Sequence, residues 1–390
     1  HATGPYDVPH ARVDCFAMYT NNPPAGAFRG FGVTQSAFAV ESNMDILAHE
    51  LGMDPFALRR KNALRVGATT ATGQVLRESV GLLDCIDWVQ ACVGELPPPV
   101  VEAGKKVAWG LACAYKNTGL GGGADDAAAA EVEVLPDGTV QVRAGSADLG
   151  QGLTTVLAQC AAEELGLPFE RVRVLLSDTD LCPDGGPTTA SRQTFVTGNA
   201  ARLAAQAMRG RLSRVAAEHW DVPPEEIWFR DGELGAAGQR AAFAVAVRWL
   251  LDEGHEPRLT YRYRAPQTEP LGSGGDMHFA FGFAAQAVEV AVEPATGHVQ
   301  VRRVVTSADG GRALNPLSFR GQIEGGIVMG IGTALTEEYR LAEGIPQTRR
   351  WKDYRTPLIG DMPAMEVHLA ENPAAAGPYG AKGVGELPSI

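Results

Sequence analysis

The order strand, turn, strand, helix occurs twice in this chain. Each copy has two short runs of strand-forming residues on either side of a glycine-containing turn, which is typical of a β-hairpin, and an apolar helical stripe after them. The first copy comprises strands at 130–134 and 139–144 and a helix from Leu153; the second comprises strands at 287–292 and 298–305 and a helix from Gly321. We therefore expect residues 103–390 to form one domain of two related α/β lobes, at about 103–220 and 271–390.

The residues before this repeat predict helices. Apolar positions recur at helical spacing between Ala37 and Leu51, with Thr34 as the expected cap and Gly52 after the end. Asp54 followed by Pro55 predicts the start of a second helix, which we expect to run through Leu64. The stiff stretch Pro97–Pro99 is the expected boundary, so residues 1–95 form a separate part of an α+β protein.

Composition excludes several classes of protein. A net charge of −12 disfavours nonspecific nucleic-acid binding. No apolar run approaches the ~20 residues that cross a bilayer, and no secretory signal opens the chain, so we expect a soluble, cytoplasmic protein. The six cysteines lie far apart and the eight histidines have no paired spacing, which argues against protein ligands for zinc or iron–sulfur clusters. The chain begins with His1 rather than Met, and we expect a piece of a longer polypeptide.

Glycine-rich segments precede several predicted helices. They are Gly30–Gly32, Gly150–Gly152, Gly185–Ser191 before a helix expected to begin near Thr197, and Gly321–Gly332. Because helix N-termini present unpaired N–H groups, glycines there let an anionic group approach. Each segment alone also fits ordinary turn geometry. Together with the loop Gly380–Glu386, they indicate a large polyanionic cofactor.

Other chemistries find less support. The run Gly119–Ala124 matches a dinucleotide fingerprint by letter, but a strand rather than a long helix follows it, so we interpret it as a loop. No G-x-S-x-G nucleophile elbow occurs. The loop Gly380–Glu386 places one carboxylate among three glycines, which suits a group aimed at a cofactor but equally fits a surface turn.

Five segments, in order along nearly the whole chain, resemble the molybdenum hydroxylases. They are Gly26–Gln35, Gly150–Gly152, Pro187–Ser191, Gly321–Gly326 and Gly380–Glu386. The resemblance is to the C-terminal part of the molybdopterin-binding subunit of the xanthine dehydrogenase and aldehyde oxidase family. It implies a molybdenum-cofactor-binding domain of two lobes, preceded by the tail of a first such domain.

The resemblance also implies roles for single residues. Glu386 matches the catalytic glutamate, a general base, and Phe31 matches an aromatic side chain that packs on a flat substrate. Arg29 and Ala190 match positions whose backbone approaches the molybdenum, which no protein atom ligates directly. The positions that match cofactor contacts are Phe28, Arg29, Gly30, Gly150, Gln151, Gly152, Ala190, Ser191 and Lys382.

Three positions depart from the family pattern. The loop Ala27–Gly32 lacks the copper-carrying cysteine of the carbon monoxide branch, which argues against that activity. Glycines at 121–123 stand where some relatives have a second aromatic residue, so one wall of the substrate site is expected to be open. Met329 stands where a glutamine near the pterin is sometimes found.

The resemblance implies hydroxylation of a heteroaromatic ring or an aldehyde carbon with oxygen from water. It implies a molybdenum–molybdopterin cofactor, whose cytosine dinucleotide form is the usual bacterial choice. It further implies 2Fe-2S and FAD partner chains that take up the electrons, and a chain or segment that carries the first half of the molybdenum domain. A non-catalytic cofactor scaffold or maturation partner is the alternative, and a plain interaction domain is a third interpretation.

Overall fold

A computed structural model describes all residues from His1 to Ile390. The chain forms two compact units, and each is described separately. The first unit comprises His1–Thr118, Glu269–Ala374 and Gly383–Ile390, and the second comprises Gly119–Thr268 and Ala375–Lys382.

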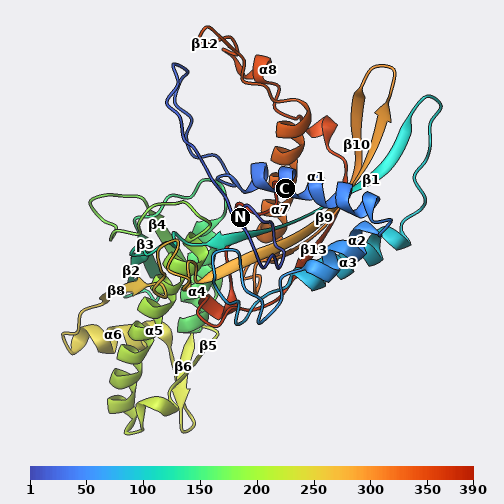
Figure 1. Ribbon diagram of the computed structural model, residues 1–390. Coiled ribbons are helices and arrows are strands. Elements are labelled where there is room, and N and C mark those ends of the chain that lie inside the picture. Colours follow the sequence, from blue (N-terminus) through green and yellow to red (C-terminus); the bar gives the residue numbers. More distant parts are fainter. The chain divides into compact units, whose positions relative to one another are not determined.

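The first unit is built on a four-stranded sheet with the order β1-β9-β10-β13 (Figure 1). Its elements are α1 (Val33–Glu50), α2 (Pro55–Asn62), α3 (Leu82–Glu95), β1 (Lys106–Thr118), β9 (Ala280–Glu293), β10 (His298–Asp309), α7 (Pro316–Leu335), β11 (Leu341–Ala342), β12 (Ile345–Pro346), α8 (Trp351–Tyr354) and β13 (Ala364–Ala370). Strands β1, β9 and β10 are antiparallel neighbours, and β13 runs parallel to β10.

Both faces of this sheet are covered, because successive strand residues point to opposite sides. Cys113 packs in the core that contains α3, whereas Ala114 packs in the core on the other face, with Ile323 and Ile327 of α7. Leu387, near the end of the chain, is fully buried in this second core. The end of the chain is therefore anchored beneath α7.

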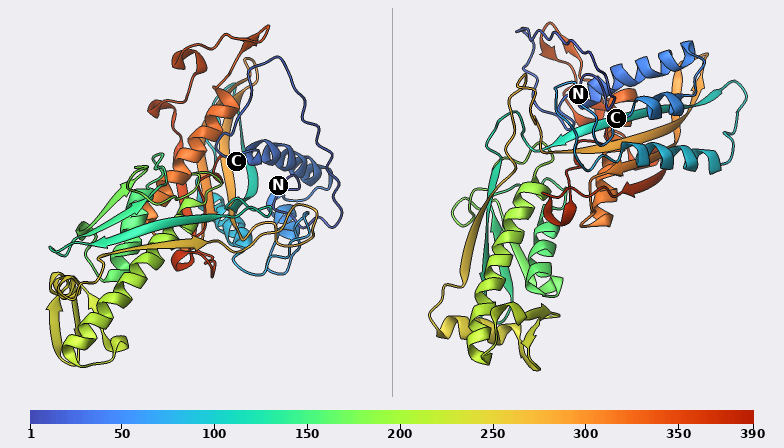
Figure 2. Two further views of the ribbon diagram at one scale, coloured as in Figure 1. Left: turned by 90° about the vertical axis from the view of Figure 1, so that its left-hand side faces the viewer. Right: turned by 60° about the horizontal axis from the view of Figure 1, so that its bottom comes forward.

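The second unit is built on a sheet with the order β4-β3-β2-β8. Its elements are β2 (Ala127–Val134), β3 (Val140–Ala144), α4 (Leu153–Leu165), η1 (Phe169–Arg171), β4 (Val172–Leu176), α5 (Gln193–Trp220), β5 (Trp228–Arg230), β6 (Glu233–Ala236), β7 (Gln239–Ala242), α6 (Phe243–Asp252) and β8 (Arg258–Arg264). The long helix α5 lies along this sheet and packs against β2, β8 and α4 (Figure 2). Strands β5, β6 and β7 form a small separate sheet.

The predicted repeat is confirmed, and it includes more elements than expected. In each unit an antiparallel hairpin, β2–β3 or β9–β10, is followed by a helix and then by a strand parallel to the second hairpin strand. An antiparallel outer strand, β8 or β1, completes each sheet. The α+β class is confirmed, while the division into cofactor-binding domains at 1–95 and 103–390 stays a prediction.

Several element boundaries differ from the sequence prediction. Helix α1 begins at Val33 with Gly32 as its cap, and the hydroxyl of Thr34 faces Ser389 at 3.0 Å instead. Helix α2 ends at Asn62, two residues before the predicted Leu64. Helix α5 begins at Gln193, four residues before the start that we expected near Thr197.

Two further regions bear on the sheets. The first twenty residues contain no strand. Strand β8, far along the chain from the hairpin of its sheet, pairs with β2 in the main sheet of the second unit. Gly119–Ala124 is a loop that leads into β2, as predicted.

Candidate functional site

The loop before α1 is held in an unusual backbone conformation. Gly30, Phe31 and Gly32 have φ angles of +98°, +42° and +95°, so three successive residues are left-handed. Glycine adopts this conformation readily, whereas a phenylalanine there is strained, and such strain concentrates at functional sites. The N–H of Phe31 donates to the carbonyl of Phe28 at 2.8 Å, and the Phe31 side chain is 70% exposed.

Arg29 connects this loop to two other parts of the first unit. Its Nε donates to the carbonyl of Gly385, and its Nη2 donates to the carbonyl and the Oε1 of Gln322 at 2.9 and 3.1 Å. Its Nη1 lies 3.6 Å from the Sδ of Met329. Burial lowers the pKa of Arg29, and the charge of Glu386 acts in the opposite direction. The guanidinium thus fixes the terminal loop against α7.

The terminal loop lies on the end of the sheet. The N–H of Gly383 donates to Oγ1 of Thr118 at 2.9 Å. A Cβ at Gly282 would lie 2.9 Å from the Gly383 carbonyl oxygen, so this close approach requires a glycine in β9. After the loop, Pro388 lies so close to α7 that a Cβ at Gly326 would lie 2.7 Å from it. These contacts fix the backbone on both sides of Glu386.

Glu386 itself is mostly buried and lies beside a lysine. Its side chain is 13% exposed, and its Oε2 lies 3.7 Å from Nζ of Lys116 in β1. Burial lowers the pKa of Lys116, and the attraction of Glu386 acts in the opposite direction. The sequence analysis missed Lys116. Its signal was a charged residue directly after the apolar run 111–115.

In the second unit, the segment at Gly150–Gly152 is organised by Asp148. Its carboxylate accepts hydrogen bonds from the N–H groups of Gly150, Gly152 and Thr154, at 3.0, 3.2 and 3.0 Å. Burial raises the pKa of Asp148, but these hydrogen bonds outweigh it and leave the pKa lowered. The carboxylate therefore caps α4 and occupies N–H groups that we expected to face an anion. An Asp shortly before a predicted helix is the signal that could have identified this cap.

Gln151 lies next to the segment that carries Ala190. The side chain of Gln151 accepts a hydrogen bond from the N–H of Leu149, and its Nε2 donates to the carbonyl of Ala147 at 3.0 Å. The N–H of Ala147 in turn donates to the hydroxyl of Thr188 at 3.1 Å. Two loops that are about forty residues apart in the sequence thus lie side by side within the second unit.

The Ala190 loop has the same kind of strained backbone as the Phe31 loop. Ala190 and Ser191 have φ angles of +50° and +51°, and the Ala190 carbonyl accepts a hydrogen bond from the N–H of Gly119 at 2.9 Å. The buried Arg192 donates to the carbonyls of Gly185 and Pro187 at 2.9 Å each. The guanidinium of Arg192 therefore holds this loop in place.

Lys382 closes the segment Ala375–Lys382 of the second unit and is almost fully buried. The carbonyl of Ala376 accepts from Nδ2 of Asn199 at 2.9 Å, and the hydroxyl of Tyr379 donates to Glu164 at 3.0 Å. Tyr379 also has a positive φ of 51°. The segment is thus attached to α4 and α5 directly before the chain enters the first unit at Gly383.

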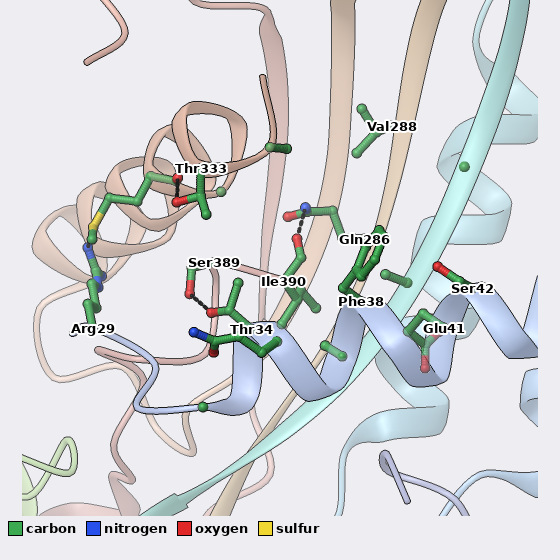
Figure 3. A pocket seen from close by; sticks show the side chains of 18 of the residues that line it. Arg29, Thr34, Phe38, Glu41, Ser42, Gln286, Val288, Thr333, Ser389 and Ile390 are labelled. Atoms are coloured by element: carbon green, nitrogen blue, oxygen red, sulfur yellow. Dashed lines mark hydrogen bonds between the residues drawn. The ribbon is translucent and has the colours of Figure 1, made fainter. Parts of the chain in front are cut away.

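A cavity of about 980 Å³ opens beside Arg29 in the first unit. It is lined by residues of α1, β1, β9 and α7 and by the terminal residues Ser389 and Ile390, and Figure 3 shows Arg29 beside α7 at its edge. Phe28 and Phe31 border this cavity, but Glu386 does not line it. The first unit therefore brings Phe28, Arg29 and Phe31 to the cavity. Glu386 lies outside the lining and follows Gly385, whose carbonyl accepts a hydrogen bond from Arg29.

The donor set of the chain fits a cofactor that carries its own metal ligands. No three His, Cys, Asp or Glu side chains are grouped so that they could hold a metal ion. The strained loop at Phe31 in the first unit and the strained loop at Ala190 in the second present main-chain atoms and small residues instead. The structure contains no helix that is both long and apolar enough to cross a membrane.

Comparison with known proteins defines the class. Residues 98–363 match a family model described as a molybdopterin cofactor-binding domain, and residues 1–63 match a second model of the same description. The fold and the two matches together show that the chain is built from molybdopterin cofactor-binding domains.

Individual relatives agree with this class. The chain is 32% identical to a probable xanthine dehydrogenase subunit of Bacillus subtilis, over all of this chain and 52% of that protein. It is 33% identical to the gamma subunit of the 6-hydroxypseudooxynicotine dehydrogenase complex of Paenarthrobacter nicotinovorans, over 98% of this chain and 49% of that one. The structure of quinoline 2-oxidoreductase from Pseudomonas putida 86 aligns with a TM-score of 0.81 at 29% identity, covering 93% of this chain and 48% of that chain.

The chain belongs to the molybdenum hydroxylase family of xanthine dehydrogenases and aldehyde oxidoreductases, as the resemblance predicted. It spans about half the length of the curated relatives it matches.

Proposed function

We propose that this chain is part of the molybdopterin-binding subunit of an enzyme that hydroxylates a heteroaromatic ring or an aldehyde carbon with oxygen from water. Membership of the molybdenum hydroxylase family supports the reaction class. The observation that carries the proposal is Glu386, a mostly buried carboxylate at the tip of a glycine loop that Arg29 and Thr118 hold in place. A fixed carboxylate is suited to general-base catalysis because geometry decides which proton it can accept.

The side chains of this chain have distinct tasks in the proposal. Glu386 accepts a proton during hydroxylation, and Phe31, at the edge of the cavity, packs on a flat substrate. The open wall expected at glycines 121–123 admits a bulky ring. The names of the relatives support a ring substrate, since xanthine and quinoline are both nitrogen heterocycles.

The molybdenum cofactor supplies the two-electron redox chemistry when it is bound. The proposed cofactor contacts are Phe28, Arg29, Gly30, Gly150, Gln151, Gly152, Ala190, Ser191 and Lys382. Arg29 and Ala190 are the positions whose main chain would lie near the metal, with no protein atom as its ligand. We propose the cytosine dinucleotide form of the cofactor.

The proposal includes partner chains and a location. Electrons leave through 2Fe-2S and FAD centres on partner chains, and a further segment supplies the first half of the molybdenum domain. Support comes from relatives that are named as subunits of dehydrogenases. We propose that the enzyme works in the cytoplasm. The loop Ala27–Gly32 has no cysteine, so carbon monoxide oxidation at a copper site is not part of the proposal.

The content of the purified complex separates an enzyme from a scaffold. The enzyme is expected to release about one equivalent of molybdenum and of pterin per chain on denaturation, and to lose activity after cyanide treatment. A cofactor scaffold or maturation partner would hold pterin without turning over any aldehyde or N-heterocycle. A plain interaction domain would release no pterin at all.

A further inference from the structure

The end of strand β1 contacts the terminal loop at two points. Side chains two residues apart in a strand point to the same face. On that face Thr118 accepts a hydrogen bond from the N–H of Gly383, and Lys116 lies 3.7 Å from the carboxylate of Glu386. Thr118 fixes the backbone of the loop, and Lys116 lies beside the carboxylate at its tip.

Lys116 occupies a site where a lysine is costly. Its side chain is only 7% exposed, and burial lowers its pKa by disfavouring the charged form. Its Nζ donates to Oδ1 of Asn117 at 2.9 Å, so the amine is held at the end of the strand. The sheet itself does not need a charge there, because neighbouring β1 residues such as Cys113 and Ala114 are apolar and buried.

Three further titratable or charged groups act on the Lys116–Glu386 pair. Arg29 interacts with the charge of Glu386 from the side of the first loop. His278, in the segment before β9, has its pKa lowered to about 4 by burial and then by the charge of Lys116. The amino group of His1 also has its pKa lowered by burial and then by Lys116. Lys116 and Arg29 are thus two cations that act on Glu386.

We propose that Lys116 is a positioning residue that holds the carboxylate of Glu386 in place through their contact at the end of β1. The inference rests on the proposed function, because it assigns Lys116 a task only if Glu386 is the base. Arg29 differs from Lys116 in that it is already committed to the carbonyls of Gly385 and Gln322. Lys116 instead contacts the side chain of Asn117 and lies directly beside the carboxylate.

The test uses the assembled holoenzyme with Lys116→Met, Lys116→Gln, Lys116→Arg and, as an exposed control, Lys61→Met. A buried cation beside a carboxylate restricts its orientation, and a misplaced catalytic group lowers the rate more than the affinity for substrate. We expect Lys116→Met and Lys116→Gln to lower kcat by on the order of 10- to 100-fold, with KM and cofactor content unchanged. Lys116→Arg, which keeps the charge, should recover most of this loss, and Lys61→Met should have the kcat of the unaltered enzyme.

The outcomes separate this inference from the proposed function. If Glu386→Gln abolishes turnover while Lys116→Met leaves kcat unchanged, Lys116 has no such role. If Glu386→Gln keeps full turnover, the base assignment fails instead. If neither Lys116→Met nor Lys116→Gln assembles with the cofactor, Lys116 is structural and the inference is wrong.

Discussion

Arg29 joins three segments that are far apart in the sequence. It lies in the loop before α1 and donates to Gly385 in the terminal loop and to Gln322 in α7. The planar guanidinium suits this task, because its rigid fork of donors reaches several acceptors at once. A lysine carries the same charge but cannot reproduce the fork.

We therefore expect Arg29→Lys to lower the free energy of unfolding by about 1–3 kcal/mol, since buried carbonyl acceptors lose their donors. It should also reduce the molybdenum retained per chain. Urea denaturation and metal analysis measure the two effects. Arg12→Lys, whose side chain is 86% exposed, is the matched control. Equal free energies of unfolding for the two variants would show that the hydrogen bonds of Arg29 do not stabilise the fold.

His278 makes the stability depend on pH. Burial, then the charge of Lys116, lowers its pKa to about 4 from the ordinary 6.5. Between these values the unfolded chain binds a proton that the folded chain does not, so stability is full above about pH 6.5 and falls as the pH drops towards 4. The loss is on the order of 2 kcal/mol.

His278→Phe should flatten this part of the curve of unfolding free energy against pH. Urea denaturation at several pH values between 7 and 4.5 measures it. His298→Phe changes an exposed histidine and serves as the control. An identical slope in both variants would contradict the assignment to His278.

Roles for Glu386, Arg29 and Phe31 follow from the family resemblance of their loops, and they stay predictions. Lys116 could not be identified in this way, because its contact with Glu386 depends on the register that places the end of β1 beside the terminal loop. Asp148 was missed because the glycines after it, and not the acidic residue, define the motif.

At the scale of elements, the glycines of α7 differ in what they do. A Cβ at Gly326 would lie 2.7 Å from Cβ of Pro388, whereas a Cβ at Gly321 would meet no atom within 4 Å. Gly326 therefore permits the terminal segment to approach the helix, and Gly321 does not limit any neighbour.

Two alanine substitutions in the same helix test this difference. Gly321→Ala should raise the free energy of unfolding by up to about 1 kcal/mol, because alanine favours the helix. Gly326→Ala should lower it by about 1–3 kcal/mol through overpacking. It should also reduce turnover, since Pro388 follows the Glu386 loop. Thermal or urea denaturation measures the free energy of unfolding of each variant. Similar stability of the two would contradict the close contact between Gly326 and Pro388.

Helix boundaries were predicted correctly where neighbouring residues determine them, and incorrectly where contacts with distant residues determine them. Asp54 caps α2 through the N–H of Ala57, with Pro55 at the first position, as the local pattern predicts. The predicted cap Thr34 failed because its hydroxyl faces Ser389, which lies at the far end of the chain. Helix α5 starts before the predicted segment because Arg192 at its start is buried against Asp126.

At the scale of the molecule, the two units share one sheet plan. Both place a hairpin in the middle, a parallel strand on one side and an antiparallel strand on the other. The hairpins and helices were predictable from alternation and turn residues. The outer strand β8 was not, because it follows its hairpin after more than a hundred residues.

The central claim is that Glu386 is the base of a molybdenum hydroxylase. Its most direct test is steady-state turnover of Glu386→Gln in the complete complex, with molybdenum and pterin content measured on the same sample. Glu170→Gln in η1, an exposed glutamate, is the matched control. We predict that Glu386→Gln keeps the cofactor and loses at least about 100-fold in kcat, because general-base catalysis contributes 10²–10⁴-fold. Turnover equal to that of the control, with the cofactor intact, would contradict the claim.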